Sequence, residues 1–408
     1  TSTVGVWRVS GKDQSFDVLV IGCGPSGGAA AFASAAHGLT TAIIDKASFP
    51  RNKLCGGLFT GRSAAYFRQV FGENLPAEHR LEQRHVAFWH DGAPLARMSD
   101  VPPLYLTMRW DLDQAIYRRV VARGVADFTG CAIAALDLER RCVTLKDGRR
   151  LSYKVLIAAD GVNSIVAKKL WGAAFDRRTI GFGLEIEAAT SSTAPFDPVR
   201  IDFAAARWGY GWSFPKPNST TIGVGGLLAE NADFKSVMTR YLRGLEIDPD
   251  TTAFKGHFIP FGDYRKRPGE GAVVLCGDAA GLVDPITGEG IAYAIKSGAL
   301  AADAAHDALR NGTPEETLAF YIKHLRPIHR SLWMARVLRN LIFAKPFEST
   351  FRRMFQHSTT LKHDYMRLLA GEKEYADIVR KLARRVPKVA AKTLQDRVRR
   401  AAKDDAAR

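Results

Sequence analysis

Three glycines near the start of the chain have the spacing of a phosphate-binding turn. Gly22, Gly24 and Gly27 follow an apolar run at 16–21 and open an alanine-rich stretch. In such a turn the first glycine permits the tight bend, the second lets the backbone approach a pyrophosphate, and the third lets helix and strand pack closely. The helix N-terminus adds free N–H groups and positive potential. Asp45, at the end of the next apolar run, can accept both hydrogens of a ribose diol. The sequence therefore predicts a dinucleotide site, with an ordinary glycine-rich turn as the alternative.

A second glycine-rich segment, 273–298, combines an aspartate with a new helix start. A short apolar run ends at Gly277 and Asp278, and Gly288 and Gly290 open an alanine-rich helix. Asp278 can bind a ribitol hydroxyl, while the helix N-terminus can stabilise negative charge on a reduced flavin ring. The alternative role for Asp278 is that of a helix cap. The segment favours FAD over NAD as the dinucleotide.

Together with a third motif, Ala159-Asp160-Gly161-x-x-Ser164, these segments resemble the FAD-dependent oxidoreductases of the p-hydroxybenzoate hydroxylase fold. The three motifs occur in order between residues 22 and 291. The resemblance implies bound FAD. It also implies an α/β fold with a Rossmann-like FAD-binding lobe, an inserted antiparallel-sheet substrate lobe and a helical C-terminal region.

Further segments narrow the resemblance to the geranylgeranyl reductase family. Residues 49–57 (FPRNKLCGG) are similar to the family's segment beside the flavin, and 209–216 (GYGWSFPK) to the stretch that lines its substrate cavity. Residues 109–113 and 368–375 fit the family pattern as well. The likeness runs from about residue 17 to residue 375.

The resemblance implies a role for each matched position. Cys55 and Tyr210 are the candidates for catalytic side chains on the reacting face. The residues expected to line the substrate are Gly57, Tyr210, Trp212 and Phe214. The residues expected to bind FAD are Gly22, Gly24, Ser26, Gly27, Asp45, Lys46, Cys55, Gly56, Arg109, Asp160, Gly161, Gly277, Asp278, Gly288, Gly290 and Ile291.

Several of these side chains also have a purely structural interpretation. Cys55 is explained equally as a small buried apolar residue, although a lysine two positions earlier favours a flavin-side role. The aromatic alternation at 210–214 fits core packing about as well as a substrate wall. The alternative interpretation of Lys216 is that of an exposed surface residue. The histidines show no metal-ligand spacing, so no metal is predicted.

The implied activity is that of an FAD-dependent reductase. It would saturate carbon–carbon double bonds of a polyprenyl or isoprenoid lipid by hydride transfer from reduced flavin. The same fold also hosts monooxygenases (hydroxylases and epoxidases) and halogenases, so these two activities are the alternatives to a reductase. The halogenase stretch Trp-x-Trp-x-Ile-Pro is altered here, with Tyr210 at its first Trp and Phe214 at its Ile. The third hypothesis, after the reductase and the oxygen-dependent enzymes, is a flavin-binding or membrane-surface protein without catalytic activity.

The electron donor is expected to visit the flavin transiently. No second Gly-x-Gly-x-x-Gly motif follows a strand, so a dedicated nicotinamide domain is not indicated. The sequence does not choose between NAD(P)H and reduced ferredoxin.

Periodicity indicates the elements that must position these residues. Runs at 16–21, 40–44, 155–159 and 272–275 are continuously apolar, as in parallel strands buried on both faces. Between 182 and 258 the pattern alternates and carries aromatic residues, which is typical of antiparallel strands. We predict an FAD-binding lobe at 14–80, 105–175 and 268–330, an antiparallel substrate lobe at 81–104 and 176–267, and a basic helical C-terminal region at 331–408.

Positive charge is concentrated at the end of the chain. The net formal charge is +16, and residues 331–408 contain 19 basic and 8 acidic residues. Within 378–400 apolar residues recur at helical steps beside basic ones, interrupted by Pro387. We expect this segment to bind an anionic membrane surface, and we expect no nucleic-acid partner. A solvated helix face is the alternative.

Composition indicates a folded protein from a reducing compartment. Hydrophobic residues make up 46% and charged residues 25% of the chain, which excludes wholesale disorder. The five cysteines fit neither a disulfide framework nor a zinc pattern. Residues 1–13 lack the apolar core of a signal peptide, and no apolar run reaches the about 20 residues that span a bilayer. We expect a cytoplasmic protein, peripheral on the inner face of the membrane. The sequence gives no indication of its oligomeric state.

Overall fold

The computed structural model describes residues 13–189, 197–251, 253–261 and 263–381. Most of the predicted basic amphipathic segment, including Pro387, lies outside these described residues.

The largest sheet is built from strands that lie far apart in the sequence. Its order is β17-β18-β11-β1-β2-β8, and β10 and β9 extend it from β11 as an antiparallel pair. β1 lies between β11 and β2 and runs parallel to both. The strands are β1 (Asp13–Ile21), β2 (Thr41–Asp45), β8 (Ala126–Thr129), β9 (Ile133–Asp137), β10 (Cys142–Leu145), β11 (Arg150–Ala158), β17 (Gly269–Glu270) and β18 (Val273–Leu275).

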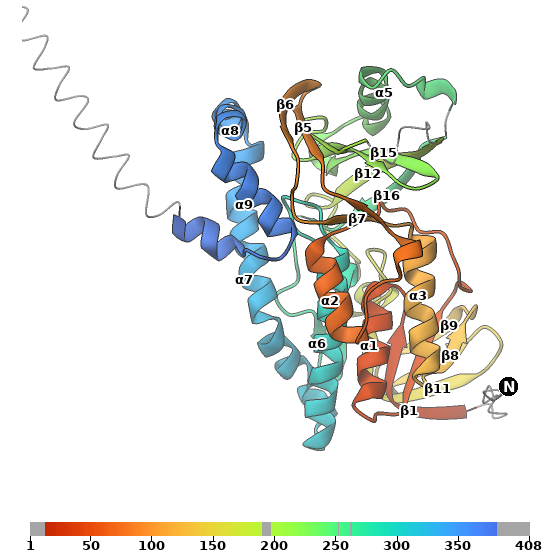
Figure 1. Cartoon of the computed structure of the whole chain (residues 1–408). Coiled ribbons are helices and arrows are strands. Elements are labelled where there is room, and N and C mark those ends of the chain that lie inside the picture. The colour runs from red at the N-terminus through yellow and green to blue at the C-terminus, as the bar shows by residue number, and fades with distance from the viewer. Residues whose placement is uncertain (1–12, 190–196, 252, 262, 382–408) are drawn as a thin grey trace, which may run out of the picture.

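Helices cover this sheet, and two of them touch at their backbones (Figure 1). A Cβ at Gly298 in α6 would lie 2.0 Å from the carbonyl oxygen of Ser26 in α1, so only glycine fits there. The predicted helix at 290–310 is confirmed as α6. The helices of this part are α1 (Pro25–Ala36), α2 (Gly61–Phe71), α3 (Arg109–Ala122), α4 (Ile165–Trp171) and α6 (Ile291–Arg310).

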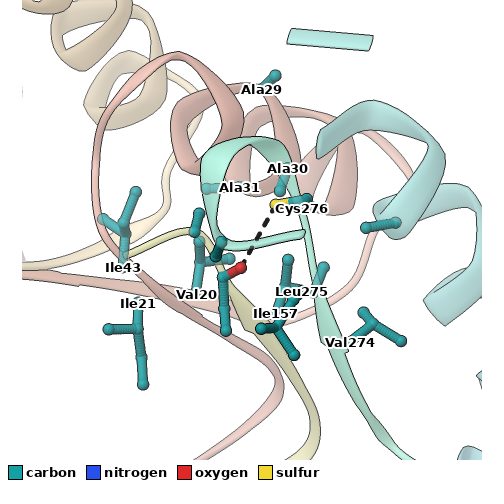
Figure 2. Packing of buried hydrophobic residues seen from close by; sticks show 14 of the residues in the cluster. Val20, Ile21, Ala29, Ala30, Ala31, Ile43, Ile157, Val274, Leu275 and Cys276 are labelled. Atoms are coloured by element: carbon teal, nitrogen blue, oxygen red, sulfur yellow. Dashed lines mark hydrogen bonds between the residues drawn. The ribbon is translucent and has the colours of Figure 1, made fainter. Parts of the chain in front are cut away.

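The core between sheet and helices is predominantly apolar (Figure 2). Aliphatic side chains of β1, β2, β11 and β18 meet the alanines of α1, and most of them have no exposed surface. The Cys276 thiol lies 3.7 Å from the carbonyl oxygen of Ala158, which links the ends of β18 and β11. This packing fixes the strand ends from which the glycine-rich turns project.

A second sheet has the order β16-β12-β15-β14-β13-β5-β6. All its pairs are antiparallel except β13 with β5, and α5 (Phe234–Gly244) packs on it. Its strands are β5 (Val86–His90), β6 (Ala93–Met98), β12 (Gly181–Ala189), β13 (Val199–Phe203), β14 (Tyr210–Pro215), β15 (Ser219–Leu227) and β16 (Lys255–Ile259). A small third sheet, β3-β7-β4, consists of β3 (Leu58–Phe59), β4 (Leu81–Gln83) and β7 (Leu104–Leu106).

Three further helices lie at one side of the molecule (Figure 1). They are α7 (Thr317–Phe343), α8 (Lys345–His357) and α9 (Thr359–Leu369). No helix in the described part of the chain is long and apolar enough to cross a membrane. A parallel sheet with helices, a second antiparallel sheet and C-terminal helices confirm the predicted fold class. The residue boundaries of the lobes stay a prediction.

Candidate active site

The first glycine-rich turn joins β1 to α1 and has no room for side chains at two of its glycines. Gly22 has a φ of +96°, and a Cβ there would lie 2.3 Å from the carbonyl oxygen of Ala159. A Cβ at Gly27 would lie 1.7 Å from the carbonyl oxygen of Gly22. These contacts fix the start of α1 at the carboxyl end of the parallel strands, where such sheets bind ligands.

Gly24 faces a pair of guanidinium groups. The atoms nearest to a Cβ there would be Nη2 of Arg51 and Nη2 of Arg109, at 3.5 and 3.7 Å. Asp113, fully buried, accepts from Nε and Nη2 of Arg109 at 2.7 and 2.8 Å and lies 3.1 Å from Nη2 of Arg51. Two cations share one carboxylate, so one positive charge remains for a phosphate. α1 has no side-chain cap, and its first N–H groups are available to the same anion.

Asp45 ends β2 and closes the turn from the other side. Its Oδ2 accepts from the backbone N–H of Cys23 at 2.8 Å, and its Oδ1 accepts from that of Ala47 at 2.9 Å. Each carboxylate oxygen can accept a second hydrogen bond, so a ribose diol still fits. Lys46 is exposed beside it.

The ends of β11 and β18 present further polar and glycine positions. Oδ2 of Asp160 accepts from the N–H of Ile165 at 2.7 Å, whereas its Oδ1 is buried without a partner among the described residues. Gly161 has a φ of +77° and no atom within 4 Å of its Cβ position. A Cβ at Gly277 would lie 2.8 Å from Oγ of Ser26. An unpaired buried oxygen and an open glycine at the strand ends fit a large polar cofactor.

Asp278 lies after β18, close to the start of α6. A Cβ at Gly290 would lie 3.6 Å from its Oδ1, and α6 begins at Ile291 without a side-chain cap. Burial raises the pKa of Asp278, while Lys53 and Arg109 oppose the shift. Burial, together with Arg109, lowers the pKa of Lys53 to about 8. The carboxylate therefore belongs to the same charged group as Lys53 and Arg109.

Lys53 connects this group to the antiparallel sheet. Its Nζ lies 2.5 Å from Nε2 of His257 on β16. Burial, with the positive charges of Lys53 and Arg109, lowers the pKa of His257 to about 4. The imidazole is therefore neutral at physiological pH and accepts a hydrogen bond from the ammonium group.

The Cys55-Gly56-Gly57 segment is held between the small sheet and the antiparallel sheet. The N–H of Cys55 donates to Oε1 of Glu185 on β12 at 3.0 Å, and burial raises the pKa of Glu185 to about 7. A Cβ at Gly57 would lie 2.1 Å from the carbonyl oxygen of Thr107 and 3.0 Å from Nζ of Lys216. Lys216 is 1% exposed, so its interpretation as a surface residue is wrong.

Two aromatic side chains of β14 lie against the same segment. A Cβ at Gly56 would lie 3.2 Å from ring carbons of Phe214 and 3.2 Å from Nε1 of Trp212. That indole nitrogen is buried and has no partner within the described chain. The ring centroids of Trp212 and Phe214 are 6.4 Å apart. β14 thus forms an aromatic wall over the backbone of Gly56.

The third aromatic residue of β14 reaches the loop before α6. The hydroxyl of Tyr210 donates to the carbonyl oxygen of Thr287 at 2.5 Å, and a Cβ at Gly288 would lie 2.6 Å from it. Burial raises the pKa of Tyr210, so the hydroxyl keeps its proton at neutral pH. The structure therefore brings the predicted substrate strand and the second glycine-rich segment into contact.

The 284–290 loop is also tied to the C-terminal region. Asp284 is 2% exposed and accepts from the hydroxyl of Tyr375 at 2.9 and 2.8 Å. Its Oδ1 also accepts from the backbone N–H groups of Ile286 and Thr287, at 2.8 and 3.0 Å. The loop conformation thus depends on a residue 91 positions further along the chain.

A second tie to the C-terminal region runs through Arg62, which is 4% exposed. Its Nη1 donates to Oε1 of Glu374 at 2.6 Å, and its Nη2 donates to the carbonyl oxygen of Leu368 at 3.1 Å. Its Nε lies 3.7 Å from Glu289, whose other oxygen accepts from Thr60. Burial raises the pKa of Glu289 to about 7.

A cavity of about 370 Å³ adjoins Asp278 on another side. Aromatic, basic and acidic side chains contribute to its lining: Trp171 and Tyr264, then Arg265, Lys266 and Arg267, and the carboxylates of Asp176, Asp263 and Asp278. None of the described residues form a group of three or more His, Cys, Asp or Glu side chains that could hold a metal ion.

Comparisons with known proteins show which family the chain belongs to. The chain is 32% identical over 320 residues to menaquinone reductase of Mycobacterium tuberculosis, a match that covers 71% of this chain and 76% of the relative. It is 31% identical over 320 residues to geranylgeranyl diphosphate reductase of Rhodobacter capsulatus, covering 74% of this chain and 78% of the relative. No family model matches the chain.

Solved structures share the fold. A geranylgeranyl bacteriochlorophyll reductase-like protein from Thermoplasma acidophilum superposes with a TM-score of 0.74 at 19% identity, over 91% of this chain and 99% of the other. The flavin-dependent brominase Bmp2 superposes with a TM-score of 0.65 at 20% identity, over 91% and 100%. The fold is that of the p-hydroxybenzoate hydroxylase-like flavoproteins. With relatives above 30% identity over most of their length, the chain belongs to the geranylgeranyl reductase family of FAD-dependent oxidoreductases.

Proposed function

We propose that this enzyme saturates carbon–carbon double bonds in the polyprenyl chain of an isoprenoid lipid. The names of two relatives, a menaquinone reductase and a geranylgeranyl diphosphate reductase, support this substrate class. The observation that carries the proposal is the contact of β14 with both Gly56 and the Gly288 loop. An apolar chain at this junction would have aromatic rings on one side and the cofactor segments on the other.

We assign FAD to the strand ends described above. Asp45 would hold the adenosine ribose, while Gly24, Arg51 and Arg109 would receive the pyrophosphate at the N-terminus of α1. Asp278 would hold the ribitol, and the N-terminus of α6 would stabilise negative charge on the flavin ring. When bound and reduced, FAD supplies the hydride. The remaining proposed contacts are Gly22, Ser26, Gly27, Lys46, Cys55, Gly56, Asp160, Gly161, Gly277, Gly288, Gly290 and Ile291.

Gly57, Tyr210, Trp212 and Phe214 are the proposed substrate contacts. Their surroundings support an apolar ligand, because these aromatic residues continue into a buried cluster with side chains of α8 and α9. Such surroundings exclude water from the reacting carbons, and exclusion of water favours transfer to the alkene over side reactions.

We propose that the proton for the second carbon of the double bond comes from a side chain near the wall. An isolated alkene accepts hydride poorly, so protonation has to accompany or precede the hydride. Cys55 and Tyr210 are the two candidates. Tyr210 keeps its proton and directs it at Thr287, whereas the Cys55 thiol has no hydrogen-bond partner among the described residues. Glu185 is a positioning residue, because it holds the backbone N–H of Cys55.

We further propose that the electron donor, NAD(P)H or reduced ferredoxin, binds transiently. The cavity beside Asp278 supports this, since its lining includes Arg265, Lys266 and Arg267. Three consecutive basic residues can contact the phosphates of a nucleotide or the acidic surface of a small redox protein, beside three aspartates in the same lining.

Anaerobic turnover tests the proposed reaction. The purified holoenzyme is reduced with NADPH or dithionite, and geranylgeranyl diphosphate is then added while flavin absorbance is followed. We expect reoxidation without oxygen and a product heavier by two hydrogens for each reduced bond. A flavin that stays reduced until air enters, followed by a product heavier by one oxygen, would replace the reductase with a monooxygenase.

A further inference from the structure

Helices α7 and α8 carry an unusual concentration of exposed apolar side chains, and the exposed side of the two helices is called their outer face below. Eight large hydrophobic residues of the described chain are strongly exposed, and five of them lie within 333–354, at 46–56% exposure. Three follow one another at four-residue steps on α7 and therefore form a single stripe. The five are Trp333, Val337, Leu341, Phe347 and Met354.

The opposite face of α7 is part of the folded interior, and on α8 the residues one and two turns beyond Phe347 are as well. Ala335 is fully buried in a cluster with Ile286 of the 284–290 loop. Phe343 and Phe351 pack against the cluster that contains Trp212 and Phe214 of β14, and so does Tyr210. Both helices are therefore anchored, and their outer stripe is a fixed surface feature. An anchored surface helix ordinarily presents polar residues outward.

Basic side chains accompany the stripe. Between residues 333 and 354 the chain has five basic residues and one acidic residue, Glu348. Of the five, Arg336 is paired with Asp263 at 3.0 Å, and the guanidinium of the half-buried Arg339 lies over the ring of Trp208. The basic residues are Arg336, Arg339, Lys345, Arg352 and Arg353.

We propose that this outer face of α7 and α8, residues 333–354, docks on an anionic lipid bilayer. An apolar stripe flanked by basic residues matches the acyl region and the phosphate layer of such a surface. The chain's own residues 382–408 are a poor alternative occupant, because they contain nine basic and three acidic residues and would bring positive charge to a positive face. A second copy of this face would bring the same charge.

The position of this outer face supplies a reason for docking on a membrane. This reason rests on the proposed function. Phe343 and Phe351, which belong to the same two helices, pack against the cluster that contains the aromatic residues Trp212 and Phe214 of β14. A polyprenyl chain that leaves the bilayer at this face would meet apolar side chains as far as Tyr210, without crossing water. The docking itself does not depend on which reaction follows.

Vesicle binding of the full-length holoenzyme tests the proposal. The triple variant Trp333→Gln, Leu341→Gln, Phe347→Gln is compared with the wild type. A matched control replaces the three other exposed hydrophobic residues by Gln, at Trp110, Val121 and Ile165, which are 39–44% exposed on α3 and α4. Partitioning is measured by flotation with vesicles of phosphatidylcholine and phosphatidylglycerol, and with vesicles of phosphatidylcholine alone. Residues 382–408 are the same in all three proteins, so their contribution cancels.

We expect the α7–α8 variant to lose at least about tenfold in partitioning onto the mixed vesicles, because three half-exposed apolar side chains no longer insert. The matched control should stay within about twofold of the wild type, and added salt should weaken wild-type binding. Equal losses in both variants, or no loss in either, would overturn the proposal. So would a variant that binds vesicles like the wild type but changes from dimer to monomer in sedimentation, since the face would then be a subunit interface.

Turnover separates this proposal from the proposed function. The α7–α8 variant should reduce dispersed geranylgeranyl diphosphate like the wild type and lose rate only on an isoprenoid lipid supplied in vesicles. If the wild type reduces neither substrate while the vesicle difference persists, the reaction is wrong and the docking stands. If both variants reduce vesicle lipid equally well, the docking is wrong and the reaction stands.

Discussion

Removing the Tyr375 hydroxyl should destabilise the loop that precedes α6. Tyr375 and Asp284 are each 2% exposed, and the hydroxyl lies 2.9 and 2.8 Å from the two carboxylate oxygens. A hydrogen bond to a charged group contributes about 1.5–3 kcal/mol. Tyr375→Phe should therefore lower the free energy of unfolding by about that amount, since Asp284 keeps only two backbone donors.

The matched control is Tyr153→Phe. Tyr153 is also buried, at 4% exposure, but its hydroxyl has no partner in the described part of the chain. Removing an unpaired buried hydroxyl should be neutral or slightly stabilising. Both variants lose the same atom, so the difference between them isolates the hydrogen bond to Asp284.

Urea unfolding of the holoenzyme, followed by circular dichroism, measures both variants. FAD affinity, measured by quenching of flavin fluorescence, should weaken for Tyr375→Phe by no more than the factor equivalent to the lost bond, about 10- to 150-fold. If Tyr375→Phe and Tyr153→Phe unfold within about 0.5 kcal/mol of each other, the Asp284 contact does not stabilise the loop and the reasoning is refuted.

Three further predictions concern the site itself. Arg109→Ala should weaken FAD binding by at least about tenfold in a fluorescence titration, because a charge-assisted contact to phosphate is lost, whereas Arg123→Ala at the exposed end of the same helix should leave it unchanged. Cys55→Ala should slow product formation while FAD stays bound, and Tyr210→Phe should do so instead if the phenol is the proton donor; loss of flavin from the Cys55 variant would make that residue structural. Burial raises the pKa of Glu185 from 4.5 to about 7, so the folded state favours the protonated carboxyl group. The stability that this protonation provides is complete below the pKa of the unfolded state, 4.5, and is lost as pH rises through 7. The Tm of Glu185→Gln relative to the wild type should therefore be higher at about pH 8 than at about pH 5, and equal differences at both would contradict the shift.

Features set by neighbours in sequence were predictable. The turn at Gly22, the following helix and the start of α6 depend on local steric rules. The structure has them at the positions that the glycine spacing predicts. Continuous apolar runs likewise identified the parallel strands, because burial on both faces leaves no polar alternation.

Features set by contacts between distant segments were not predictable. Glu185 is one position in an alternating strand, and nothing local indicates that it holds the backbone of Cys55. The pairing of Tyr375 with Asp284 and the burial of Lys216 against Gly57 depend on how three segments meet in space. A charged side chain has the same sequence signature at a surface and in a buried pair.

The strand order of the main sheet has a consequence for synthesis on the ribosome. β1, β2, β8 and β11 emerge early, but β18 and α6, which cover one edge of β11 and one side of α1, emerge only after the whole antiparallel lobe. Until then the nascent chain exposes an unpaired strand edge and an alanine-rich helix surface. Sheets that pair distant segments fold slowly and are exposed to aggregation meanwhile. Expression of this enzyme should therefore depend on a holding chaperone, and fragments that stop before residue 310 should aggregate.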